Sequence, residues 1–156
     1  MPTDLQIQEV GVLDLEAIQQ ILFHRGRMLL VDRVKEFDQG HRELIAELLV
    51  TADHCAGHCP NGQPVFRGVD MVEALAQAAG LLARLIWSSS EFRAFRGTGE
   101  VIFRRKVVPG ETLSLRVKLI DERLRGALKI FDGEVWVGEE VAASVKNISI
   151  LFSNPS

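Results

Sequence analysis

Residues 68–87 read GVDMVEALAQAAGLLARLIW, and the predicted fold follows mainly from this segment. It is rich in Ala and Leu and contains neither Pro nor a run of β-branched residues, so it predicts one long helix. Between residues 71 and 83 the only polar side chains are Glu73 and Gln77. A helix that is apolar on nearly every face has to be buried on nearly every side. The sequence therefore predicts a central helix enclosed by the rest of the chain.

The chain on either side of this helix predicts strands and turns. Residues 113–119 alternate apolar with polar side chains, which indicates a strand with one buried face. Pro109-Gly110 suits the centre of a type II turn, and Gly138-Glu139 suits a two-residue hairpin turn. From their apolar composition we expect further strands at residues 28–37, 44–50, 127–137 and 140–152.

Three segments are expected to lie outside the sheet. Asp14 is a suitable N-cap for a short helix over residues 15–22. Residues 57–68 hold three Gly and two Pro, which predicts a loop. Residues 88–99 are expected to form a loop or an irregular connection.

These elements predict a single α+β domain over residues 1–156. About six antiparallel strands can bury one helix only if their sheet curls around it. The sheet of one protomer rarely covers such a helix on every side, so we also expect a homodimer.

Composition narrows the class of protein. Of the 156 residues, 47% are apolar and 25% are charged, which is ordinary for one globular domain. A net charge of −3 argues against a nucleic-acid binder, and no apolar run is long enough to span a membrane. Residues 1–11 lack the apolar region of a signal peptide, and Cys55 and Cys59 are the only cysteines. We therefore expect a cytoplasmic protein with free thiols.

Glu73 is the most informative single residue. A lone carboxylate in an apolar helix is costly to bury in its ionised form, so we expect its pKa to be raised. A carboxyl group that is partly protonated near neutral pH is what a general acid requires. Gln77 lies one turn later and can hold Glu73 by a hydrogen bond. A structural Glu paired with an Arg or a backbone amide is equally compatible with the sequence.

His58 and Gly68 flank the loop before the helix. An imidazole with its usual pKa is a ready base at neutral pH, although a lone loop His is more often structural. Gly68 opens the helix, where free backbone N–H groups can stabilise a developing negative charge such as a thioester enolate. An ordinary Gly N-cap is the alternative. Asp70 in the first turn would weaken this effect unless its side chain points away.

Several blocks of sequence resemble one family. GHCP at residues 57–60, followed by VEALAQAAG at residues 72–80, resembles the signature of the 3-hydroxyacyl-acyl carrier protein dehydratases of fatty acid synthesis. Further similar blocks follow in the family's order over nearly the whole chain. They are LFHR (22–25), LLVDRV (29–34), PV (64–65), GV (68–69), FRR (103–105), VVPG (107–110), VGE (137–139) and VA (141–142).

The resemblance implies a hotdog fold, in which a sheet wraps one central helix and two protomers share a continuous sheet. It implies an active site between protomers, where His58 of one faces Glu73 of the other. His58 would remove the proton α to the thioester carbonyl, and Glu73 would protonate the departing β-hydroxyl. Gly68, Val69, Gln77 and Phe66 are assigned to oxyanion and substrate binding. No metal or redox cofactor is implied.

The resemblance also implies a partner, acyl carrier protein bearing a 3-hydroxyacyl thioester, and a possible hexamer of three dimers. Carrier proteins are acidic, so their docking needs a local basic patch on this mildly acidic chain. In a strand Arg104 and Lys106 would share one face. We expect these two residues, with Arg67, to meet the carrier. A solvated strand edge is the alternative.

The chain departs from the family's pattern near the expected site. It contains no Tyr, although family members often place one near the substrate tunnel; Trp87, Phe92 or Phe95 are candidates to replace it. The other departures are Cys59 in place of Phe, one extra residue within 61–63, Phe66-Arg67 in place of Met-Pro, and Asp70 in place of an apolar residue. They suggest an altered substrate or a reduced activity.

Three other interpretations stay open. Hotdog proteins include thioesterases, in which Glu73 would be ionised and would activate water. The chain can also be a non-catalytic subunit that binds an acyl carrier. A zinc site from His54, Cys55, His58 and Cys59 is disfavoured, because tetrahedral sites usually draw ligands from two separated pairs. His24 and Arg25 match the family, and we expect them to be structural.

Overall fold

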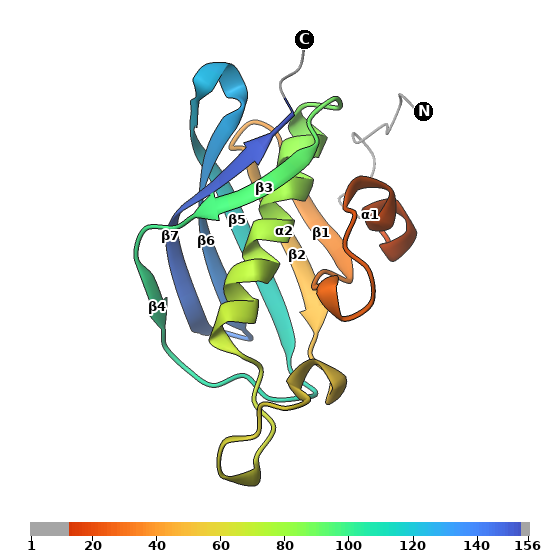
Figure 1. The fold of residues 1–156 in the computed structure, drawn as a ribbon, viewed down its shortest axis with the longest axis vertical. Helices are drawn as coiled ribbons and strands as arrows, with labels where there is room; N and C mark the ends of the chain where they lie inside the picture. The colour runs from red at the N-terminus through yellow and green to blue at the C-terminus, as the bar shows by residue number, and fades with distance from the viewer. Residues whose placement is uncertain (1–12, 154–156) are drawn as a thin grey trace.

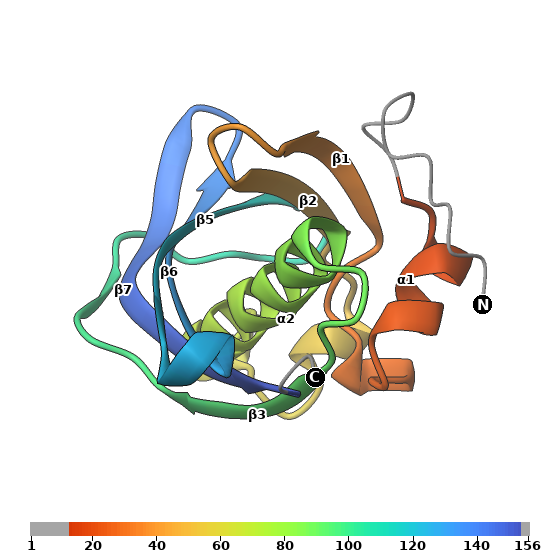
Figure 2. The ribbon, with the colours of Figure 1, turned by 90° about the horizontal axis from the view of Figure 1, so that it is seen from above.

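A long helix lies in the hollow of a strongly curved antiparallel sheet (Figures 1 and 2). This computed structural model describes residues 13–153. The helices are α1 (Leu15–Ile21) and α2 (Gly68–Ile86). The strands are β1 (Arg33–Asp38), β2 (Glu43–Leu49), β3 (Phe92–Gly97), β4 (Val101–Phe103), β5 (Thr112–Arg123), β6 (Leu128–Val137) and β7 (Glu140–Phe152). The expected α+β hotdog fold is confirmed, with seven strands where about six were expected.

The sheet order is β1-β2-β5-β6-β7-β3, and the short strand β4 pairs separately with β7. Chain neighbours pair in β1–β2, β5–β6 and β6–β7, while α2 connects β2 to β3 at the far end of the sheet. This crossover carries α2 along the concave face (Figure 2). The two sheet ends, β1 and β3, lie on opposite flanks of the helix.

Small residues let α2 lie close to the sheet. Its central turns are fully buried and carry several Ala residues. On the sheet side, a Cβ added to Gly133 of β6 would lie 3.1 Å from the side chain of Leu75. Gly133 therefore makes room for Leu75. This close packing of the helix on the sheet forms the hydrophobic core of the domain.

The two predicted turns are confirmed by their backbone angles. Gly110 has φ of +94°, as the third position of a type II turn requires, and Gly138 has φ of +57° in the β6–β7 hairpin. The cap of α1 is also confirmed, since Asp14 Oδ1 accepts a hydrogen bond from the N–H of Ala17 at 2.9 Å.

Two predicted segments need correction. The strand expected over residues 28–37 begins only at Arg33, because the backbone of Met28 and Leu30 is bonded to the side chain of Gln77 instead of to a neighbouring strand. The irregular connection expected over residues 88–99 contains β3, which pairs with β7. Most β3 side chains are exposed, so this edge strand lacks the alternation that marks a half-buried one.

Among residues 13–153, no helix is long and apolar enough to cross a membrane.

Candidate active site

The Glu73 side chain projects from the second turn of α2 and is 31% exposed. Gln77, one turn later, is fully buried and donates a hydrogen bond from Nε2 to Glu73 Oε1 at 3.0 Å. The predicted bond between these two side chains is therefore confirmed. Gln77 is itself fixed, because Nε2 also donates to the carbonyl of Met28 at 2.6 Å and Oε1 accepts from the N–H of Leu30 at 2.8 Å.

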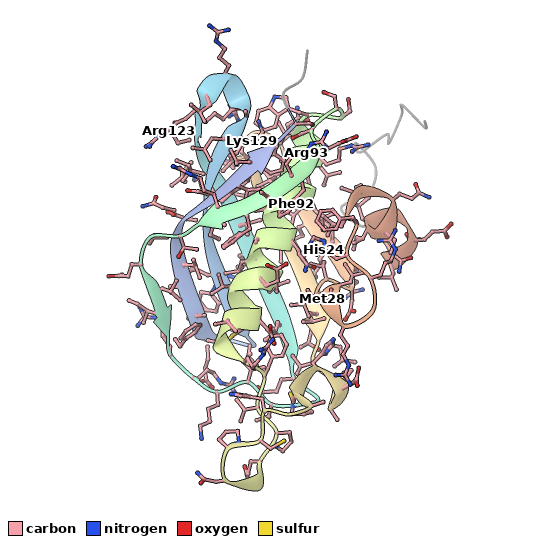
Figure 3. The ribbon with its side chains drawn as sticks, in the orientation of Figure 1. His24, Met28, Phe92, Arg93, Arg123 and Lys129 are labelled. Atoms are coloured by element: carbon pink, nitrogen blue, oxygen red, sulfur yellow. The ribbon has the colours of Figure 1, made fainter. Side chains whose placement is uncertain are left out.

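His24 is a neighbour of Glu73 that sequence reasoning assigned to a purely structural role. Its Nε2 lies 3.5 Å from Glu73 Oε1, and its side chain is only 7% exposed. Figure 3 shows His24 beside α2, with Met28 below it and Phe92 above it. The only feature of the sequence that pointed to His24 was the resemblance of residues 22–25 to the family, and this resemblance did not indicate a chemical role for the side chain.

The protonation of Glu73 differs from the expectation. Burial raises the pKa of this carboxyl, but the contacts with His24 and Gln77 outweigh burial and leave the pKa below its usual value. The predicted raised pKa is therefore wrong for this protomer. The reason is that the carboxylate has two nearby donors and keeps part of its surface in solvent.

His58 lies in the loop between two short 3₁₀ turns and is oriented by three bonds. Its backbone N–H donates to the carbonyl of Cys55 at 2.9 Å, and its carbonyl accepts from the N–H of Val65 at 3.0 Å. On the ring, Nδ1 lies 2.8 Å from the carbonyl oxygen of Val65. A carbonyl can only accept, so in the neutral ring Nδ1 carries the hydrogen. Nε2 is then the nitrogen that is free to act as a base.

Glu73 and His58 line the same hollow within one protomer. This cavity of about 520 Å³ is bounded by α2, the loop of residues 54–58 and the segment of residues 27–30. Its other titratable side chains are Arg27, Asp53, His54, Arg67 and Asp70. A second hollow of about 580 Å³ shares His58, Phe66 and Arg67 with the first and extends to β4. His58 therefore stands at the junction of two adjoining hollows.

The second hollow contains the start of α2. Gly68 and Val69 both line it, and the Val69 side chain is 62% exposed. A Cβ added to Gly68 would lie 2.8 Å from the Phe103 ring, so glycine fits at the helix start without displacing this ring. Phe66 is buried and its N–H donates to the carbonyl of Val107 at 2.8 Å, which ties the loop to the chain after β4.

Asp70 is neutralised by an ion pair. The guanidinium of Arg67 donates two hydrogen bonds of 2.9 Å to the two Asp70 oxygens. This bidentate pair offsets the negative charge that was expected to weaken anion binding at the helix start. Two of the departures from the family pattern, Arg67 and Asp70, therefore compensate each other in the structure.

The expected docking residues line the second hollow, but Arg104 and Lys106 are not within a strand. β4 ends at Phe103, so the strand expected over residues 104–106 is wrong. The N–H groups of Arg104 and Arg105 both point to the carbonyl of Ala142, which irregularly continues the pairing with β7. Arg105 is paired with Glu111 at 2.7 Å, whereas Arg104 and Lys106 are exposed.

The cysteines and histidines near His58 do not form a metal centre. Within residues 13–153, no group of three or more His, Cys, Asp or Glu side chains is placed to hold a metal ion. Cys55 is buried, and this burial raises the pKa of its thiol, while Cys59 is exposed. Trp87, a candidate tunnel residue, lies against Lys129 at 4.2 Å near the opposite end of α2.

Comparison with solved structures supports the fold. A dehydratase heterocomplex, ApeI:P, from Xenorhabdus doucetiae aligns with a TM-score of 0.67 over 89% of this chain and 91% of that chain, at 17% identity. A hypothetical thioesterase with coenzyme A from Streptococcus pneumoniae aligns with a TM-score of 0.60 over 79% of this chain and 87% of that chain, at 7% identity. At these identities the likeness establishes the fold alone.

Comparison with sequences establishes the family. The family model of the FabA-like domain matches residues 22–146. A 3-hydroxyacyl-[acyl-carrier-protein] dehydratase FabZ from Moorella thermoacetica is 44% identical over 137 residues, covering 84% of this chain and 91% of the relative. The protein of the same name from Desulforamulus reducens is 39% identical over 138 residues, covering 86% and 94%. The chain therefore belongs to the FabA-like family and groups with relatives named as FabZ dehydratases.

Proposed function

We propose that this protein is a hydro-lyase that converts 3-hydroxyacyl thioesters on acyl carrier protein into trans-2-enoyl thioesters. One observation carries the proposal beyond the family relationship. The chain holds a base, His58, whose free nitrogen is set by its bond to Val65, and a carboxyl group, Glu73, held by Gln77, and both side chains line a hollow where a substrate can reach them. A base and an acid oriented in this way are what the removal of water from adjacent carbons requires.

In this mechanism Nε2 of His58 takes the proton from the carbon next to the thioester carbonyl. The electron pair delocalises into the carbonyl, and the free N–H groups at the start of α2, beginning with Gly68, stabilise the resulting oxyanion. The β-carbon–oxygen bond then breaks, and the hydroxyl leaves as water with a proton from Glu73. In the reverse reaction, hydration, Glu73 begins ionised and activates the water.

Glu73 has to be protonated when dehydration begins, yet its pKa is lowered in the free protomer. An acyl chain and a second protomer would cover the exposed part of this side chain. Loss of that solvent favours the neutral acid and raises the pKa. We therefore propose that Glu73 becomes a general acid only in the covered site, where His58 of one protomer faces Glu73 of its partner.

A mass-spectrometric assay with 3-hydroxyacyl-carrier protein tests the reaction. Wild type should produce a thioester lighter by one water, and His58→Ala and Glu73→Gln should each abolish that product. Release of free acid by wild type would instead identify a thioesterase, which the ionised Glu73 would suit. No turnover across several chain lengths by a folded dimer would leave a non-catalytic carrier-binding subunit.

We further propose that the acyl carrier protein docks beside the second hollow, on Arg104, Lys106 and Arg67. These three residues and His58 line one hollow, so a carrier bound there would stand next to the proposed base. The proposal includes a homodimer, with three dimers as the possible larger assembly, and a cytoplasmic location.

Charge reversal tests this docking surface. Arg104→Glu with Lys106→Glu should raise the KM for the carrier-bound substrate about 10-fold or more while kcat stays close to wild type. The matched control is Arg123→Glu with Arg125→Glu, an equal change of charge at the distant β5–β6 hairpin, where Figure 3 places Arg123. An equal rise of KM in both variants would show a general charge effect and would remove the proposed surface.

A further inference from the structure

We propose that His24 is a positioning residue for Glu73: together with Gln77 it occupies one carboxylate oxygen, Oε1, and leaves Oε2 as the oxygen that exchanges protons with the substrate. This inference rests on the proposed function, because it assigns a role within the same site. His24 does not touch the substrate in this account and acts only through Glu73.

The two neighbours of Glu73 converge on the same oxygen. His24 Nε2 lies 3.5 Å from Oε1, and Gln77 Nε2 lies 3.0 Å from Oε1. No residue between 13 and 153 donates a hydrogen bond to Oε2. Both neighbours therefore lie on the side of Oε1, and the second oxygen remains available for proton transfer. A carboxyl group held in this way also has a fixed orientation.

The ring of His24 has little freedom to turn. It stacks on Phe23 with a centroid distance of 4.3 Å and an angle of 18° between the rings. Phe92 packs against it edge-on, with a centroid distance of 5.7 Å. Phe92 is anchored in β3 and contacts α2 near Gly80. The packing of Phe23 and Phe92 therefore holds the His24 ring in the orientation in which Nε2 faces Glu73.

The other ring nitrogen shows which form of His24 is present. Nδ1 is buried and has no hydrogen-bond partner among the described residues. A positively charged ring would carry a hydrogen on Nδ1, and a buried unpaired N–H is costly. The neutral form with its hydrogen on Nε2 avoids that cost and directs its only N–H to Glu73 Oε1.

The buried Nδ1 of His24 has no hydrogen-bond partner among the described residues, and this lowers the stability of the fold. Phe at this position would keep the stacking on Phe23 and Phe92 and would remove the unpaired atom. A purely structural role would favour such an apolar ring. The retention of an imidazole that points at a proton-transferring carboxyl is typical of a functional site, where stability is given up for chemistry.

The donor also shifts the balance between the two forms of Glu73. Its contact favours the carboxylate and opposes the burial that favours the acid. Besides Glu73, the charged or titratable groups that line the hollow are Arg27, Asp53, His54, His58, Arg67 and Asp70. None of these six forms an ion pair or a hydrogen bond with the Glu73 carboxyl, whereas His24 Nε2 lies 3.5 Å from its Oε1.

The test compares His24→Phe, which removes the donor, with His24→Gln, whose amide can restore one near the position of Nε2. His41→Phe is the matched control, because His41 is 72% exposed on the turn between β1 and β2. For each variant kcat, KM and the thermal midpoint are measured. The titration of Glu73 is followed by carboxyl ¹³C NMR and assigned by its absence in Glu73→Gln.

We expect His24→Phe to keep or raise the thermal midpoint, to lower kcat about 10- to 100-fold with little change in KM, and to raise the pKa of Glu73. His24→Gln should recover part of the lost kcat and move the pKa of Glu73 back towards wild type, and His41→Phe should match wild type. An unchanged kcat and an unchanged Glu73 titration in His24→Phe would overturn the inference. Full activity in Glu73→Gln would overturn the proposed function instead, so the two failures are distinct.

Discussion

At His58, one hydrogen bond determines which nitrogen of the ring can take a proton. Val65 accepts the hydrogen of Nδ1, so the loop positions Nε2 as the base. At Glu73 the corresponding selection is made between oxygens, since Gln77 and His24 both approach Oε1. The proposed chemistry therefore depends on groups that touch the two residues and not on the two residues alone.

The pH dependence of stability follows from Glu73. Its pKa is lowered on folding from 4.5, so its ionised form stabilises the native protein above about pH 4.5, and this contribution disappears as the pH falls through the lowered value. Replacing Glu73 with Gln removes the titration. We therefore expect the stability of wild type relative to Glu73→Gln to decline as the pH is lowered from about 5 to 3, as measured by urea unfolding. A relative stability that rises over this range would contradict the lowered pKa.

Only one of the two contacts of Glu73 could be predicted from the sequence. Glu73 and Gln77 could be paired in advance because helical spacing places them on one face. His24 could not be joined to them, because its contact with Glu73 depends on how the segment before β1 packs on α2. The pKa of Glu73 was predicted in the wrong direction for the same reason: burial was visible in the sequence, and the second donor was not.

At the scale of elements, the burial of α2 and the curvature of the sheet around it depend on each other. The apolar run of residues 71–83 was sufficient to predict a buried helix and a curled sheet. The first strand was placed too early, because Gln77 takes the backbone bonds of Met28 and Leu30. β3 was missed, because an exposed edge strand carries no pattern of alternating burial. Local patterns therefore predicted the core of the fold better than its edges.

The contact between β4 and the start of α2 gives a prediction at this scale. Gly68→Ala would place a methyl group 2.8 Å from the Phe103 ring, which is half exposed and can move aside. We expect a modest loss of stability, about 1 kcal/mol, but a loss of kcat of about 10-fold or more, because the added methyl group and the displaced ring both enter the hollow where the substrate carbonyl would bind.

A second substitution separates these effects. Phe103→Ala removes the ring that the added methyl group would strike, so Gly68→Ala with Phe103→Ala should recover much of the kcat lost in Gly68→Ala. Phe103→Ala alone provides the reference value. No recovery in the double variant would show that the steric contact is not what requires glycine at residue 68.

At the scale of the whole molecule, no strand of the sheet that residues 13–153 form lines the hollow of the candidate site. The hollow beside Glu73 is bounded by α2 and by loops, and the sheet ends on either flank of the helix at β1 and β3 (Figure 2). Exposed edge strands favour pairing with another chain. A second protomer at β3 would extend the sheet and cover α2, and we propose that it also brings its own His58 to Glu73.

The most direct test of this account is the activity of a mixed dimer, in which one protomer carries His58→Ala and the other Glu73→Gln. The two chains are co-expressed with different affinity tags, and the heterodimer is purified through both tags. If each site takes His58 from one protomer and Glu73 from its partner, one of the two sites is intact, and the heterodimer should dehydrate its substrate at about half the wild-type rate. If each protomer uses its own His58 and Glu73, every site is defective, and an inactive heterodimer would contradict the account.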